Sequence, residues 1–238
     1  MIGNFLINLF AGIVVFVFGY FFPKMQLTFQ TRNVKYLWKH FFKRKNVKVV
    51  LSTRLGPYQR STPRVSILEM KGFVILSNLL TRFKFVLEPR SSEDKLTDLK
   101  DEDLIILGGP AANKISLEIW NNLSSKLPCL INLDEQKITI ADRIYKPLYD
   151  VEGCVQTDYA IVLRTKHPYN MDRTIFLCFG CHGFGTLGAV NMITNDTKVR
   201  TIEKRIKSDD FILFCKIDFK NQKLIDTNIV ESYSINHI

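Results

Sequence analysis

The chain has 238 residues, and hydrophobic residue types make up 46% of it, which argues against intrinsic disorder. Its formal net charge of +10 is placed unevenly: no Asp or Glu precedes Glu69, whereas residues 1–68 contain 11 Lys and Arg. The remaining residues hold 22 basic side chains (33 less 11) against 23 acidic ones. A nucleic-acid-binding domain would carry its basic patch on the folded body, so this distribution argues against nucleic acid and favours an anchor near anionic lipid.

The N-terminal stretch FLINLFAGIVVFVFGYFF, residues 5–22, contains no charged side chain. As a helix rising about 1.5 Å per residue, it would be close to the thickness of a bilayer's hydrocarbon core. A cleavable signal peptide would begin with a basic residue and end in small residues, and this stretch does neither. We therefore predict a retained transmembrane helix over residues 1–23. The basic residues from Lys24 onward predict a single-pass protein of the inner (cytoplasmic) membrane with its C-terminal domain in the cytoplasm.

Residues 24–45 form a basic segment with an apolar stripe. Val34, Leu37, Trp38 and Phe41 follow the spacing of one helical face, while lysines occupy the other faces. This pattern is typical of a helix that lies among lipid headgroups, and we expect a juxtamembrane role. An ordinary amphipathic helix that packs on the domain is the alternative.

Residues 46–238 predict an alternation of strands and helices. Strands are expected at 46–53, 84–88, 104–107, 158–164 and 174–180, with a hairpin over 129–133 and 137–141 and an antiparallel pair over 211–219 and 223–232. Helices are expected at 61–83, 111–124, 183–193 and 201–206. Continuous apolar strands between helices favour an α/β domain with a Rossmann-like, mostly parallel sheet covered by helices on both faces.

The five cysteines predict neither a metal site nor a disulfide framework. Cys178 and Cys181 have the CxxC spacing, but no second pair of ligands accompanies them. We interpret them as buried thiols in a reducing compartment.

Four loops that follow predicted strands carry the candidate ligand-binding residues. In a doubly wound sheet, ligands bind beyond the carboxyl ends of the strands. Six of the 12 glycines lie in two of these loops, GGPAAN after 104–107 and GCHGFGTLG after 174–180. Glycine lets a ligand approach the backbone, and the helix that follows each loop offers unpaired N–H groups to phosphate. The candidates are Thr53, Arg54, Tyr58, Arg60, Gly108, Gly109, Asn113, Arg164, Lys166, His182, Gly183, Gly185 and Thr186.

The motif GFGTLG fits the dinucleotide fingerprint GxGxxG, since it follows a strand and opens a helix. It comes late in the sheet, however, and the acidic residues about 20 positions on precede a strand instead of ending one, which argues against a dehydrogenase. Glycines that serve only tight turns and packing remain an alternative. Glu69 and His182 are candidate catalytic residues, but no second acid is positioned for either, and no Walker A or GxSxG motif occurs.

The GGPAAN turn, the GCHGFGTLG turn and the N-terminal apolar helix together resemble membrane-anchored, Rossmann-like nucleotide-sensing modules of bacterial antiphage systems, the SLOG- and TIR-like group that includes effectors of cyclic-oligonucleotide signalling. The resemblance covers residues 46–238 and implies that the loop glycines, Asn113 and neighbouring cations recognise a nucleotide signal. It also implies homo-oligomerisation and disruption of the lipid bilayer through the N-terminal helix.

Two classes of function stay open at this point. In the first, the chain is a non-enzymatic nucleotide sensor and effector in antiviral defence. In the second, it is a membrane-anchored hydrolase, a nucleosidase or an NAD-cleaving enzyme that uses Glu69 or His182. The several cations and glycines at the loop edge, without an acid–base pair, favour the sensor.

Overall fold

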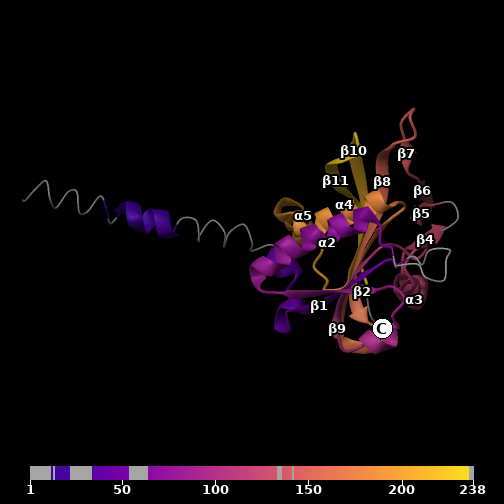
Figure 1. Cartoon of the computed structure of the whole chain (residues 1–238). Helices are drawn as coiled ribbons and strands as arrows, with labels where there is room; N and C mark the ends of the chain where they lie inside the picture. Colours follow the sequence, from indigo (N-terminus) through magenta and orange to yellow (C-terminus); the bar gives the residue numbers. More distant parts are fainter. Residues whose placement is uncertain are drawn as a thin grey trace, which may run out of the picture.

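The computed structural model in Figure 1 describes residues 12, 14–21, 34–53, 64–132, 136–140 and 142–235. Its central sheet has the strand order β11-β10-β8-β9-β3-β1-β2, and β7 pairs with β8 beside this path. The strands are β1 (Asn46–Leu51), β2 (Val86–Ser91), β3 (Asp103–Leu107), β7 (Leu148–Tyr149), β8 (Val155–His167), β9 (Asn170–Gly180), β10 (Phe211–Lys220) and β11 (Lys223–Ser234). A small antiparallel sheet comprises β4 (Cys129–Asn132), β5 (Lys137–Ile140) and β6 (Arg143–Tyr145). The helices are α2 (Ile67–Leu80), α3 (Lys114–Leu123), α4 (Gly183–Thr194) and α5 (Asp196–Arg205), with 3-10 turns η1 (Phe41–Lys43), η2 (Thr81–Phe83), η3 (Leu96–Leu99) and η4 (Ser124–Lys126).

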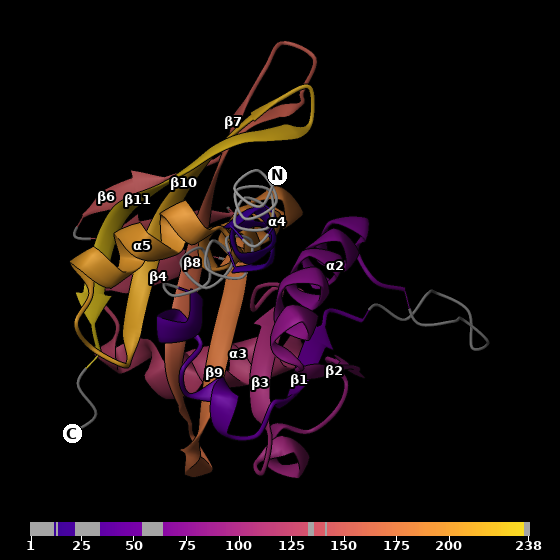
Figure 2. The ribbon, with the colours of Figure 1, turned by 90° about the vertical axis from the view of Figure 1, so that its left-hand side faces the viewer.

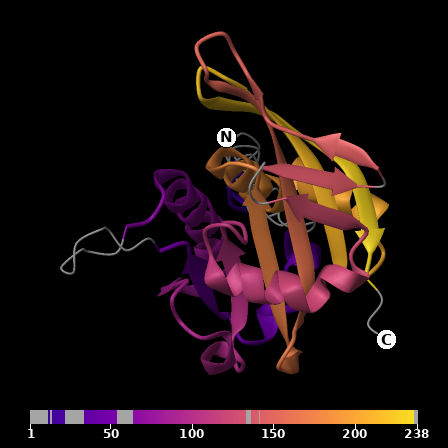
Figure 3. The ribbon, with the colours of Figure 1, turned by 90° about the vertical axis from the view of Figure 1, so that its right-hand side faces the viewer.

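Both faces of the central sheet are covered, as the apolar strands predict. Figure 2 shows α2, α4 and α5 over one face, where Leu76, Val190 and Ile202 belong to one buried cluster. Figure 3 shows α3 and the small sheet over the other face, where Ile119 and Ile138 belong to a second cluster. The α/β class is therefore confirmed, and the hairpin predicted over 129–133 and 137–141 is the pair β4–β5.

The central sheet is mixed, so the expectation of a mostly parallel sheet holds for only part of it. The pairs β1–β2, β1–β3 and β3–β9 are parallel, whereas β8 runs antiparallel to both β9 and β10, and β10 runs antiparallel to β11. Only Pro168 and Tyr169 separate β8 from β9. A parallel crossover needs a dozen or more residues, so this connection is a hairpin and the chain reverses.

The apolar stripe that begins at Val34 packs on the domain and not on lipid headgroups, which is the alternative interpretation of that segment. The side chains of Trp38 and Phe41 are both 0% exposed. The indole Nε1 of Trp38 donates to the carbonyl of Ile193 at 3.1 Å, and both aromatic rings pack against Phe176. This segment is therefore part of the domain core.

Residues 14–21 are helical, and their large apolar side chains are exposed, Val15 at 72% and Phe18 at 65%. Within the described ranges, no helix is both long enough and apolar enough to cross a membrane. The predicted transmembrane helix thus gains no support from the described part of the chain, and most of residues 1–23 lies outside it.

Candidate functional site

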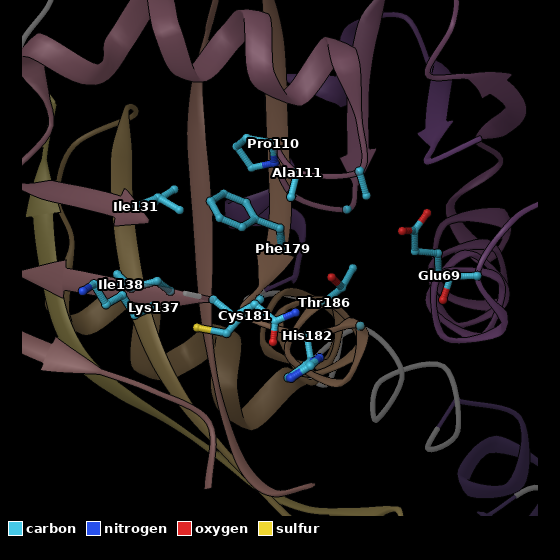
Figure 4. Close-up of a pocket in the computed structure, with 17 residues that line it drawn as sticks. Glu69, Pro110, Ala111, Ile131, Lys137, Ile138, Phe179, Cys181, His182 and Thr186 are labelled. Carbon is cyan, nitrogen blue, oxygen red and sulfur yellow. The ribbon is translucent and has the colours of Figure 1, made fainter. Parts of the chain in front are cut away.

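A cavity of about 210 Å³ lies where β3 and β9 end and where α2 and α4 begin (Figure 4). The parallel pairing of β1, β3 and β9 brings the carboxyl ends of these strands to one edge of the sheet. Residues from both glycine-rich turns line the cavity, together with the start of α2 and the strands of the small sheet. The lining residues are Ser66, Glu69, Gly108, Gly109, Pro110, Ala111, Ala112, Ile131, Gln136, Lys137, Ile138, Phe179, Gly180, Cys181, His182, Gly183 and Thr186.

The β3–α3 turn needs glycine at position 108. Gly108 has φ +98, and a Cβ there would lie 2.1 Å from Ser52 Oγ and 2.7 Å from Glu69 Oε1. Any L side chain would therefore be strained and would also displace Glu69. Beyond the turn, Asn113 caps α3, since its Oδ1 accepts from Ser116 N at 3.0 Å and its Nδ2 donates to Leu107 O at 3.1 Å. These two hydrogen bonds of Asn113 stabilise the conformation of the β3–α3 turn, although Asn113 itself does not line the cavity.

Glu69 lies in the first turn of α2, after the N-cap Ser66, and only 5% of it is exposed. The backbone N–H of Ser52 donates to Glu69 Oε2 at 2.8 Å, which fixes the carboxylate against the end of β1. A carboxylate in the first helical turn also interacts favourably with the helix dipole. Glu69 is thus a buried, oriented acid in the cavity wall.

In the β9–α4 turn, two glycines lie close together, and a side chain from another strand caps the helix. A Cβ on Gly180 would lie 2.4 Å from the Cα of Gly185, so neither position tolerates a side chain without a shift. The N-cap residue His182 makes no side-chain cap of its own. Instead, Asp158 Oδ2, from the start of β8, accepts from Gly185 N and from His182 N. A residue far away in sequence therefore performs the capping of α4.

Asp158 is 0% exposed, and its Oδ1 accepts from Tyr159 N at 2.8 Å. Burial raises the pKa of the Asp158 carboxyl to about 7, and the backbone donors Tyr159, Gly185 and His182 oppose that rise. Because the carboxyl already uses two N–H groups at the α4 N-terminus, a bound anion would have to use the N–H groups between them, those of Gly183 and Phe184.

The ring of His182 contacts Tyr149 in β7. Its Nε2 lies within hydrogen-bonding distance of the Tyr149 hydroxyl, and burial lowers the pKa of His182 below its usual 6.5. The ring is therefore neutral at pH 7. The neighbouring Cys181 lines the cavity, but burial raises the pKa of its thiol to about 12, so it is not a reactive thiolate.

The opposite wall is mostly apolar. Phe179, Ile131 and Ile138 face the cavity from β9 and the small sheet, with Lys137 beside them (Figure 4). On the other side of Glu69, a second cavity of about 320 Å³ is lined by Ser52, Arg64, Val65, Ser66, Glu69 and Ala112. The two cavities share Ser66, Glu69 and Ala112 in their linings, so they are neighbours. We call the first, which holds Phe179, Ile131 and Ile138, the apolar lobe, and the second the polar lobe.

The structure brings six of the predicted site residues to the cavity and separates others from it. Those in the wall are Glu69, Gly108, Gly109, His182, Gly183 and Thr186. Gly185 and Asn113 support the wall from behind. Thr53 is buried in the loop after β1, where its N–H donates to Ser92 Oγ at 2.9 Å. Three predicted residues, Arg54, Tyr58 and Arg60, lie outside the described residues.

Arg164 and Lys166, which the sequence analysis placed beside the other candidates, do not line this cavity. Because β8 runs antiparallel to β9, its carboxyl end lies at the opposite edge of the sheet. The Arg164 guanidinium is buried there; it donates to Leu37 O at 2.7 Å and Ser208 O at 3.3 Å and stacks on Phe211 at 4.7 Å. Arg164 is therefore a structural residue that ties the N-terminal segment to the loop before β10.

Sequence reasoning missed Asp158, Phe179 and the contribution of the small sheet. Asp158 could have been found from the short connection between β8, the strand in which it lies, and β9. That connection implies a hairpin, and a hairpin brings the start of β8, not its end, to the carboxyl edge of β9. Nothing in the sequence alone indicates that Lys137 and Ile138 close the cavity. Comparison with protein-family models gives no match for this chain, and comparison with curated protein sequences gives none either.

Proposed function

We propose that this chain binds a nucleotide, or a related ligand that joins an apolar ring to a phosphate, in the two-lobed site around Glu69. The observation that carries the proposal is the convergence of α2, α3 and α4, whose first residues or preceding turns all line or border one cavity. Helix N-termini favour anions through their unpaired N–H groups and their partial positive charge.

The two lobes match the two halves of such a ligand. Phe179, Ile131 and Ile138 offer an apolar surface for a base, and Phe179 offers an aromatic ring for stacking. Arg64 and Ser52 border the polar lobe, where a phosphate would find a cation and hydroxyl donors. The cavity of about 210 Å³ is smaller than the roughly 300–1,000 Å³ of typical drug-sized sites, which favours one nucleoside unit over a whole dinucleotide in the enclosed part.

The sensor is favoured over the hydrolase by the surroundings of the two candidate catalytic residues. Glu69 lies in α2 and His182 is the N-cap residue of α4, on another side of the cavity (Figure 4). The ring of His182 is within hydrogen-bonding distance of the Tyr149 hydroxyl. An acid–base pair needs both groups within hydrogen-bonding reach of one substrate. Oligomerisation and disruption of the inner membrane in antiphage defence belong to the same proposal, and they rest on the apolar N-terminal segment.

The hydrolase remains a second candidate because of one observation, the orientation of Glu69. The Ser52 N–H fixes its Oε2, which leaves the carboxylate at the junction of the two lobes, where the bond between base and sugar would lie. Cleavage of that bond by a carboxylate requires such a position.

One experiment separates the outcomes. The full-length protein is incubated with a panel of mononucleotides, NAD and cyclic dinucleotides, and both the thermal shift and product formation are recorded. The sensor predicts a shift without turnover, and it predicts that Lys137→Ala and Arg64→Ala reduce the shift while Lys166→Ala, at the opposite edge, does not. Turnover that Glu69→Gln abolishes would establish the hydrolase instead. If no compound shifts the melting temperature, the nucleotide proposal fails in both forms.

A further inference from the structure

Two hairpins project together from one end of the sheet, and we call them the arm. The arm comprises residues Leu148–Thr157, which include β7 and the start of β8, and residues Asp218–Asp226, which join β10 to β11. The pairing of β8 with β9 ends at Ala160–Gly180, but β8 continues to pair with β10 as far as Thr157–Asp218. Figures 2 and 3 show both hairpins rising side by side beyond the body of the domain.

The root of the arm is packed, but its outer part is not. At the root, Phe219 is 6% exposed and its ring contacts that of Phe184 at 5.0 Å. Farther out, Val151 is 103% exposed, Ile225 62% and Leu148 54%. Hairpins that bury little surface are marginally stable in water, and exposed large apolar side chains at such a place are available for contact. The outer part of the arm is therefore suited to contact with another molecule.

The charges at the tip indicate which molecule. The turn between β7 and β8 carries Asp150 and Glu152, and residues 148–157 contain no Lys or Arg. The turn between β10 and β11 carries Lys220 and Lys223, and residues 219–225 contain no Asp or Glu. An acidic turn thus lies beside a basic turn. No ion pair joins these two turns in the described part of the chain, while Asp218 and Asp226 at the root pair with Lys216 and Lys198.

Such a surface is complementary to itself. A second copy related by a two-fold axis places its basic turn against the acidic turn of the first, and the reverse contact follows by symmetry. We propose that the arm is a self-association surface, on which the arm of a second copy of this chain docks. Apolar contact through Leu148 and Val151 of the β7 hairpin adds buried area, and the charged turns set the register. Tyr149 of the arm contacts His182 in the wall of the nucleotide cavity, but Leu148, Val151 and the charged turns do not line that cavity, and the proposal does not depend on nucleotide binding.

Charge exchange tests the proposal. The full-length protein is studied in a non-ionic detergent at low salt by sedimentation velocity over a range of concentrations. Wild-type protein is expected to dimerise. Glu152→Lys and Lys223→Glu are each expected to weaken the dimer at least about tenfold, because each places like charges together twice in a two-fold pair. An equimolar mixture of the two variants is expected to recover dimerisation, since every contact between the two chains is then again between opposite charges.

The matched control is Lys204→Glu, a charge reversal of an exposed residue on α5, which is expected to leave the dimer unchanged. All the altered side chains are exposed, so far-UV circular dichroism is expected to match wild type, as is the melting temperature at a concentration at which every variant and the wild type are monomeric. A monomeric wild-type protein would overturn the proposal. So would dimers that persist in both single variants, which would show association through another surface, and so would a mixture that stays monomeric.

Discussion

Replacement of Gly108 by alanine measures how tightly the β3–α3 turn is built against Glu69. The positive φ of +98 costs an alanine about 1–2 kcal/mol. The added Cβ would also lie 2.1 Å from Ser52 Oγ and 2.7 Å from Glu69 Oε1, so both side chains must shift. Overpacking of this kind costs roughly 1–3 kcal/mol. We expect Gly108→Ala to lower the free energy of unfolding by about 2–5 kcal/mol in total.

Gly153 supplies the matched control, since it has φ +79 but no atom within 4 Å of the position that a Cβ would occupy. Gly153→Ala should therefore lose only the conformational part, about 1–2 kcal/mol. Urea denaturation of the full-length protein, followed by the fluorescence of the buried Trp38 and Trp120, gives both values. The double variant Ser52→Ala/Gly108→Ala should recover part of the loss, because the nearest atom is removed. Equal losses of unfolding free energy in Gly108→Ala and Gly153→Ala would contradict the close approach of Ser52 and Glu69 to Gly108.

Three further predictions follow from the same structure. Asp158 has its pKa raised by burial from 3.8 to about 7, so the folded state binds the proton more tightly than the unfolded chain. This contribution to stability is complete below about pH 4 and is lost as the pH rises through about 7, by a few kcal/mol (about 1.4 per pKa unit). Asp158→Asn should therefore reduce the difference between the free energies of unfolding that urea denaturation gives at about pH 5 and about pH 8. An unchanged difference would contradict the raised pKa of Asp158. Arg164→Met should lower the free energy of unfolding by about 3–5 kcal/mol, because it leaves buried carbonyls unpaired, and should leave nucleotide affinity unchanged in titration calorimetry on folded protein. Trp38→Ala should cost about 3–5 kcal/mol in the same denaturation assay, whereas a small loss would indicate that this ring is not in the core.

The two glycine-rich turns could be predicted because the signal is local. An apolar run that ends in glycines and continues with a helical pattern specifies a strand, a turn and a helix within about a dozen residues. The structure places Gly108 and Gly183 in one cavity for the reason that the sequence suggested, namely the parallel pairing of β3 and β9.

The direction of β8 could not be obtained from its own residues. A buried strand has the same apolar run whichever way it points, and only the length of its connections decides. Because β8 runs antiparallel to β9, Arg164 lies at the opposite edge of the sheet and Asp158 lies beside the N-terminus of α4. The role of Trp38 was open for a similar reason, since an aromatic stripe fits a protein core as well as a lipid surface.

The most direct test of the central proposal is hydrogen–deuterium exchange of the full-length protein with and without the nucleotide that gives the largest thermal shift. If the cavity between the two glycine turns is the ligand site, the backbone amides of residues 108, 109, 111, 112 and 180–186 should exchange several-fold more slowly in the presence of the nucleotide. The hairpin turn at Pro168 and Tyr169, at the opposite edge, should be unaffected. Protection confined to that opposite edge, or no protection in either glycine turn, would contradict the account.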